Sequence, residues 1–169
     1  MASALNVKVG VCSVSVDGVD LGHTKGGVSV SYEPKFKEIM VDLYGETVVE
    51  KVLVGQRLIA KVPLAEYTIA NLRKAMPQTE FAGAANARIT IGHNAGQSGL
   101  TDAVQLVLHP ISEGTRRYDT VIYKACASGT VELKFNNDDE RVIEVTFEGL
   151  VDESKSDGNY LGLIGDSTA

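Results

Sequence analysis

The feature that most constrains the fold is a repeated alternation of apolar and polar residues in short runs. Residues 28–32 read Val-Ser-Val-Ser-Tyr, and residues 143–148 read Ile-Glu-Val-Thr-Phe-Glu. A period of two is typical of a β-strand that buries one face and exposes the other. Valine is abundant and the 17 glycines lie largely between such runs, which favours strands joined by tight turns.

Turn-forming residues divide the chain into these strands. Asp17-Gly18 and Gly26-Gly27 predict tight turns, and Asn136–Asp139 predicts the turn of a late hairpin. Pro34 is expected to interrupt the strand that begins at residue 28. Residues 36–43 are expected to continue as strand or as irregular extended chain. The other predicted strands cover residues 6–16, 19–24, 57–64, 87–91, 103–109, 119–126, 130–136 and 140–150.

One segment changes period. Ala65, Ile69, Leu72 and Met76 recur at helical spacing, and Pro77 is expected to end the helix. Glu66 is expected in the first turn, with Arg73 and Lys74 in the last, where these charges match the helix dipole.

The predicted fold is mainly β: an antiparallel β-sandwich or barrel with one short α-helix. The 169 residues correspond to a single domain, with an extended, polar C-terminal tail from about residue 153 to 169.

The charge and composition exclude some function classes. The net charge of -6 and pI near 5.1 disfavour binding to DNA or to anionic membranes. Residues 1–5 lack the features of a signal peptide, and no apolar run reaches the ~20 residues that span a bilayer. We therefore expect synthesis in the cytosol and no membrane partner.

The residues that carry chemistry form no convincing catalytic or metal-binding pattern. The three histidines are scattered, without HExxH or HxH spacing. The glycine-rich segment 92–99 lacks the strand–loop–helix context of a phosphate loop, and 136–140 lacks the glycine and distal glutamate of an EF-hand. We expect no enzymatic activity, no catalytic residues, no cofactor and no bound metal.

The middle of the chain carries the most informative pattern. Residues 42–55 read Asp-Leu-Tyr-Gly-Glu-Thr-Val-Val-Glu-Lys-Val-Leu-Val-Gly, followed by a strand and then by Leu64-Ala-Glu66 and Tyr67–Leu72. In this order the segment resembles phage tail tube proteins, the major tail proteins of bacteriophages. The opening hairpin around residues 17–27, the strand 119–125 and the late segment 145–152 fit the same family.

The resemblance implies a structural virion protein of the phage tail tube type. Six subunits would form a ring, the rings would stack into a tube, and strands from all six would make a continuous inner barrel. The tape-measure protein and then the ejected DNA would pass through the lumen without specific binding. Baseplate or tail-tip proteins and a tail terminator would be partners, and a contractile sheath is left open. The protein would assemble in the bacterial host cytoplasm and end in the virion tail.

The resemblance also implies where rings contact each other. The stretch of about residues 34–55 would be a stacking loop. The alternative is that Tyr44-Gly45 is an ordinary turn and the acidic residues are simply solvated. The expected inter-subunit contacts are Lys37, Asp42, Tyr44, Glu46, Glu50 and Lys51.

The two cysteines allow a further hypothesis. Cys12 and Cys126 have no CxxC spacing, so two buried apolar side chains are one interpretation. A disulfide within the chain or between subunits is the other, since virions leave the reducing cytosol.

Two other functions are compatible with the sequence. A tube protein of a related injection machine, such as a type VI secretion system or a phage-tail-like bacteriocin, would share the fold and the assembly. A β-sandwich ligand-binding module is disfavoured, because such modules usually display exposed aromatic platforms and this chain has no Trp.

Overall fold

The structure, a computed structural model, describes residues 10–83, 87–133 and 140–166. The prediction of a mainly β, antiparallel protein with one short α-helix is confirmed. The strands are β1 (Cys12–Val16), β2 (Val19–Asp20), β3 (Ser29–Met40), β4 (Val48–Leu64), β5 (Glu80–Ala82), β6 (Arg88–Thr90), β7 (Val104–Pro110), β8 (Asp119–Ala127), β9 (Ile143–Leu150) and β10 (Gly162–Gly165), and the helix is α1 (Ile69–Ala75). Two short 3-10 turns, η2 (Asp42–Tyr44) and η3 (Arg116–Tyr118), complete the elements.

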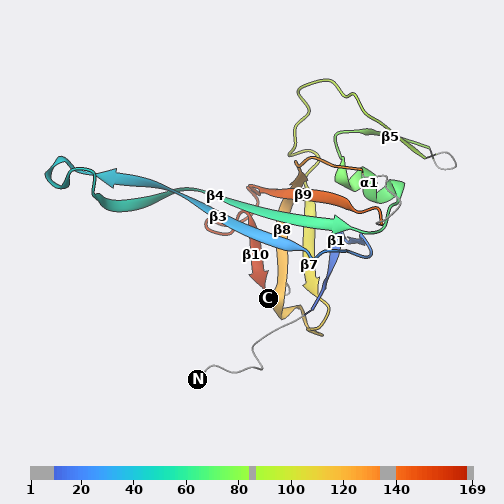
Figure 1. The fold of residues 1–169 in the computed structure, drawn as a ribbon, viewed down its shortest axis with the longest axis horizontal. Helices are drawn as coiled ribbons and strands as arrows, with labels where there is room; N and C mark the ends of the chain where they lie inside the picture. Colours follow the sequence, from blue (N-terminus) through green and yellow to red (C-terminus); the bar gives the residue numbers. More distant parts are fainter. Residues whose placement is uncertain (1–9, 84–86, 134–139, 167–169) are drawn as a thin grey trace.

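Eight strands form one antiparallel sheet that folds over itself. Its order is β2-β1-β7-β8-β9-β4-β3, with β10 also paired to β8. The first half of β8 pairs with β10 and its second half, from Lys124 to Ala127, pairs with β9, so the sheet divides there into two layers. Figure 1 shows β3, β4 and β9 running across β1, β7, β8 and β10. In the described part of the chain the sheet does not close into a barrel, and the fold is a sandwich.

The core lies between the two layers. Alternate residues of each strand point inward, which is why the period-two pattern of the sequence marks the buried positions. α1 covers one end of the sandwich with Leu72 and Ala75. The buried side chains of the two layers include Val14, Val16, Leu106, Leu108, Ile122 and Ala125 on one side and Leu58, Ala60, Val62, Leu64, Ile143, Val145 and Phe147 on the other.

The helix is shorter than its apolar spacing predicts. It begins at Ile69, after Thr68, whose side-chain oxygen accepts a hydrogen bond from the Asn71 amide at 3.1 Å. This N-cap decides the start, and Glu66 lies before the helix instead of in its first turn. Arg73 and Lys74 do occupy the last turn, as predicted. Within the described residues no helix is long and apolar enough to cross a membrane.

The strand predictions hold for most of the chain and fail at several places, among them β5, which was not predicted, and β4, which begins at Val48 instead of residue 57. Pro34 does not interrupt β3, because β3 is an edge strand and a missing backbone donor is tolerated there. Residues 130–133 form no strand, and β9 pairs with β8 and β4 instead of a hairpin partner. Residues 134–136 and the whole predicted turn at 136–139 lie outside the described residues, as do residues 6–9 of the first predicted strand. Finally, the C-terminal tail contains β10, since Gly162 fits closely against β8 where a side chain would not.

The first hairpin forms as predicted. β1 and β2 are joined at Asp17-Gly18, where both residues have positive φ angles, 52° and 73°. This is the backbone that a two-residue hairpin turn requires. β2 is only two residues long, shorter than the predicted return strand over 19–24.

Candidate assembly interface

A two-stranded ribbon projects from the sandwich. We call residues 29–57, which comprise β3, the tip and the distal part of β4, the arm. Figure 1 shows the arm extending well beyond the other strands. No residue from Ser29 to Arg57 is buried. A stretch of 29 residues that adds nothing to the core is positioned for contact with something outside the domain.

The sequence builds this ribbon by local pairing. β3 and β4 are antiparallel neighbours from Ser29↔Lys61 to Met40↔Val48, with register shifts between Lys35 and Phe36 and between Ile39 and Met40. At the tip, the 3-10 turn η2 leads into Gly45, whose φ of 61° favours glycine. Three backbone hydrogen bonds close the tip: Tyr44 N to Val41 O at 3.0 Å, Gly45 N to Asp42 O at 3.3 Å and Thr47 N to Tyr44 O at 3.2 Å.

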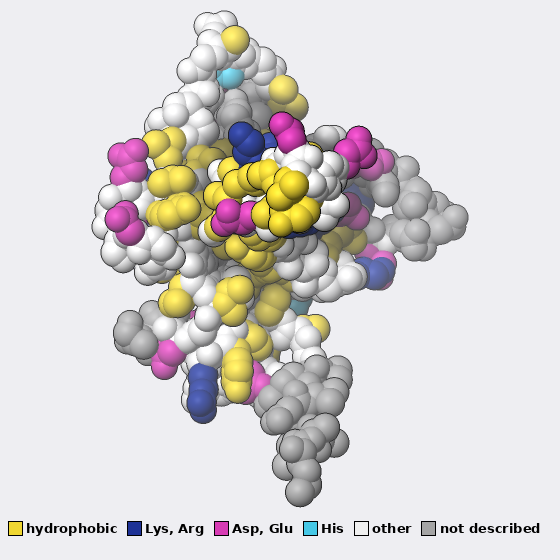
Figure 2. Space-filling model, turned by 90° about the vertical axis from the view of Figure 1, so that its left-hand side faces the viewer, with side chains coloured by type: hydrophobic (Ala, Val, Ile, Leu, Met, Phe, Trp, Pro, Cys, Tyr) yellow, Lys and Arg dark blue, Asp and Glu magenta, His cyan; other side chains and the backbone are white. Residues whose placement is uncertain are grey.

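The arm is apolar although it is exposed. The structure describes 24 large hydrophobic residues that are exposed, and ten of them lie between residues 36 and 54. Figure 2, which looks along the arm toward the body, shows hydrophobic side chains gathered at its centre. Exposed apolar surface of this extent marks an interaction site. The ten residues are Phe36, Ile39, Met40, Val41, Leu43, Tyr44, Val49, Val52, Leu53 and Val54.

Both faces of the ribbon combine apolar and charged side chains. On one face the cross-strand pair Phe36–Leu53 is followed by the pair Glu38–Lys51, whose Oε1 and Nζ atoms are 2.8 Å apart. On the other face Lys37 lies opposite Val52, and Ile39 lies opposite Glu50. An isolated two-stranded ribbon is marginally stable in water. We conclude that the arm is suited to being covered on both faces by a partner.

The six contact residues expected from the sequence all lie on the arm, and all are exposed. Asp42 and Tyr44 form part of the tip turn, and Glu46 follows it. Tyr44-Gly45 is indeed a turn, as the alternative interpretation held, but it is the end of a long ribbon and its tyrosine is 58% exposed. Whether these six side chains contact another subunit stays a prediction.

Sequence reasoning missed the exposed apolar side chains of the arm. It named charged residues and Tyr44, whereas Phe36, Leu43 and Leu53 are also exposed on the arm. A signal was present: residues 48–54 read Val-Val-Glu-Lys-Val-Leu-Val, with apolar residues at both parities. A strand with one buried face alternates, so apolar residues on both faces outside the core indicate a second buried environment.

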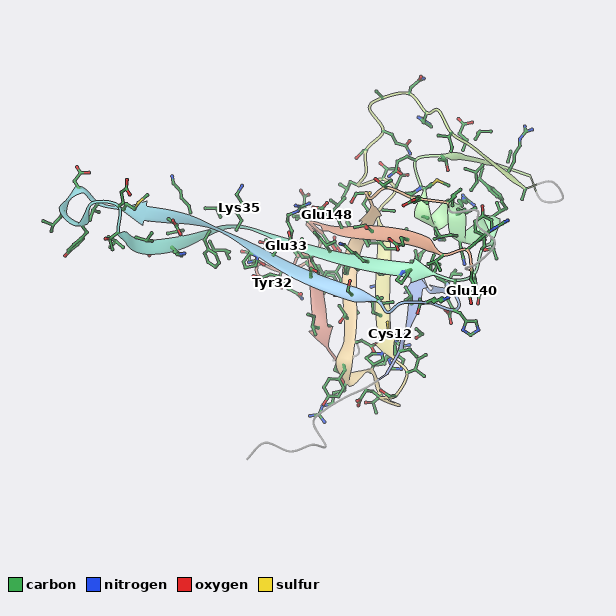
Figure 3. All side chains as sticks on the ribbon, in the orientation of Figure 1. Cys12, Tyr32, Glu33, Lys35, Glu140 and Glu148 are labelled. Carbon is green, nitrogen blue, oxygen red and sulfur yellow. The ribbon has the colours of Figure 1, made fainter. Side chains whose placement is uncertain are left out.

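An ion pair joins the root of the arm to the sandwich. Arg57 Nε donates to Glu148 Oε1 on β9 at 2.8 Å. This hydrogen bond lowers the pKa of the Glu148 carboxyl and raises the pKa of the Arg57 guanidinium. Figure 3 labels Tyr32, Glu33 and Lys35 on β3, where this strand leaves the sandwich, and Glu148 on β9, the strand on the other side of β4.

The two cysteines are both free thiols, and they form no disulfide with each other. Cys126 is buried on β8 and Cys12 is partly buried on β1. Desolvation raises the pKa of both thiols, which reduces the thiolate fraction that disulfide exchange requires. An inter-subunit disulfide through either residue stays a prediction.

A polar row crosses the outer face of β1, β7 and β8. Ser13 lies opposite His109, and His109 Nδ1 lies 2.6 Å from Oδ1 of the buried Asp119. The Ser13 hydroxyl donates to the His109 backbone carbonyl at 3.4 Å, not to its ring. The row therefore lacks the nucleophile-to-base hydrogen bond that a serine hydrolase uses. Among the described residues, no group of three His, Cys, Asp or Glu side chains could hold a metal ion.

No family model matches the chain, and no curated protein matches it.

Proposed function

We propose that this chain is a structural subunit that assembles with copies of itself through the arm, in the manner of a phage tail tube. The observation that carries the proposal is the arm: 29 consecutive residues without one buried side chain, in which large apolar residues are concentrated. In a monomer this ribbon leaves apolar side chains exposed to water, which is unfavourable, and it contributes nothing to the core. In an assembly the same ribbon is an interface.

The edges of the sheet support assembly into a closed ring. Among the described strands β10 pairs only with β8, so its other edge is open, and β2 covers only the end of β1. Unpaired edges invite pairing with another chain. If β10 of one subunit met the β1 edge of the next, the contact would use two different surfaces and could close into a ring.

A tube needs two kinds of contact, and the two surfaces would each provide one. Sheet edges would join subunits within a ring, while the arm would join one ring to the next. The number of six subunits and the passage of tape-measure protein and DNA come from the resemblance to tail tube proteins. A tube of a related injection machine would use the same two surfaces with a different cargo.

The test removes the distal part of the arm and keeps the body of the fold. Lys35 and Gly55 are direct cross-strand partners, so residues 36–54 can be replaced by Asn-Gly, which favours a two-residue hairpin turn. We expect a folded monomer with an unchanged far-UV circular dichroism spectrum per body residue, because none of the deleted residues is buried. Negative-stain microscopy should show tubes of uniform bore for the full chain and none for the shortened one. Tubes formed by the shortened chain would refute the role of the arm.

A further inference from the structure

An apolar hollow opens at the root of the arm. It has a volume of about 160 Å³, and none of its lining residues is charged. β3 and β4 contribute one wall, and the segment that ends in β10 contributes the other. The lining residues are Tyr32, Gln56, Leu58, Gly158, Tyr160, Leu161, Gly162 and Ile164.

The hollow is a gap between the two layers at one edge of the sandwich, and we call this gap the seam. Leu58 is buried on β4, and a side-chain carbon added at Gly162 of β10 would lie 2.9 Å from Leu58 Cδ2, so the two layers nearly meet here. Tyr32 and Ile164 flank the seam but stay 56% and 69% exposed. Since β3 and β10 are both edge strands, no further strand of the described chain covers the gap between them. An apolar side chain from outside would complete this edge of the core.

The tip of the arm carries a side chain that fits. Leu43 in η2 is 82% exposed, more than any other large hydrophobic residue that the structure describes. A cavity of roughly 150 Å³ with apolar walls accommodates a benzene ring, so one leucine side chain matches the volume of this hollow. Exposed leucine and uncharged hollow are complementary in both size and polarity.

The tip of the same chain cannot reach its own hollow. Tyr32 and Met40 lie on one continuous strand, and eight residues of strand span about 26 Å. The ribbon therefore holds its tip away from its root. The occupant must come from another copy.

We infer that Leu43 at the arm tip of one copy seats in the hollow at the arm root of the next copy. This inference rests on the proposed assembly through the arm and adds its receiving surface. Tip and hollow are different surfaces, so each copy donates one tip and accepts one. Such a heterologous contact propagates in one direction and gives a polar, open-ended stack. The seated arm would also cover Val30, which shares the face of Tyr32 on β3 and is exposed.

Disulfide trapping tests the contact directly. The background is Cys12→Ser with Cys126→Ala, which removes both native thiols. Leu43→Cys and Ile164→Cys are combined in this background, and the assembled protein is oxidised and run on a non-reducing gel. We expect a ladder beyond dimer for the double cysteine variant, because every copy can be linked to two others. Each single variant should give dimers at most.

The matched control is Ile91→Cys with Ile164→Cys. Ile91 is 80% exposed, close to Leu43, but lies in the loop after β6 instead of on the arm. It should give no ladder. If the double variant Leu43→Cys/Ile164→Cys forms tubes without a ladder, the receiving surface is wrong while the proposed assembly stands. If the unmodified chain forms no rings or tubes, the proposed function itself fails, and this inference with it.

Discussion

Two phenylalanines provide a matched test of what the arm is for. Phe147 on β9 is 1% exposed in the core, whereas Phe36 on the arm is 49% exposed. The same truncation to alanine should therefore affect different properties. We expect Phe147→Ala to reduce the free energy of unfolding, and Phe36→Ala to weaken assembly.

The magnitudes follow from burial. Removing a fully buried phenylalanine costs about 3–5 kcal/mol of unfolding free energy. Phe36 lies opposite Leu53 in the ribbon, and a cross-strand pair contributes roughly 0.2–1 kcal/mol, so the monomer should lose no more than that. If assembly covers the exposed half of a side chain of about 200 Å², the contact contributes about 2.5 kcal/mol, or a rise of about 60-fold in the critical concentration for tube growth.

Two measurements separate the variants. Urea unfolding followed by circular dichroism gives the unfolding free energy of the monomer, and sedimentation of tubes over a dilution series gives the critical concentration. Phe36→Ala should unfold close to the unmodified chain and assemble only at much higher concentration. The reasoning is refuted if Phe36→Ala leaves the critical concentration unchanged, or if it destabilises the monomer as much as Phe147→Ala does.

Two further predictions concern the sandwich itself. Thr68→Ala should destabilise the fold by about 1 kcal/mol because it removes the N-cap of α1, while Thr68→Ser keeps the hydroxyl and should behave like the unmodified chain; equal urea midpoints for all three would contradict the capping role. Glu148→Gln should lower the unfolding free energy at neutral pH but not in acid, because the hydrogen bond from Arg57 lowers the pKa of this carboxyl. Stability from a depressed pKa is present above the ordinary glutamate value and is lost as pH falls through the folded value. The difference between the two proteins should therefore shrink below the ordinary glutamate pKa, and a difference that persists at low pH would show that Glu148 stabilises by packing alone.

The local patterns of the sequence predict the body of the fold well. The alternation in residues 143–148 becomes β9, with Ile143, Val145 and Phe147 in the core. Asp17-Gly18 forms the expected hairpin turn because this residue pair favours the positive φ angles that the turn requires. Local propensity and burial agree at these positions, so no distant contact is needed to predict them.

Predictions failed where pairing partners decide the outcome. Nothing near Pro34 in the sequence says that its strand lies at a sheet edge, where a proline is tolerated. The strand predicted over 130–136 has a suitable alternation, but β9 pairs with β8 and β4, which lie far from it in sequence. β10 forms because β8 offers an edge to a glycine-containing segment.

The candidate interface was likewise predictable in part from the sequence and in part only from the structure. The resemblance of the sequence to tail tube proteins pointed to residues 34–55 as a contact segment, and the six expected contact residues all lie on what proves to be the arm. Only the tertiary structure decided that this segment is a ribbon without a buried residue, that its apolar side chains face both ways, and that a hollow lies at its root. The physical reason is that an apolar residue in a sequence predicts that its side chain will be buried, but it does not say which surface will bury it. The structure shows which apolar residues the domain covers and which it leaves exposed.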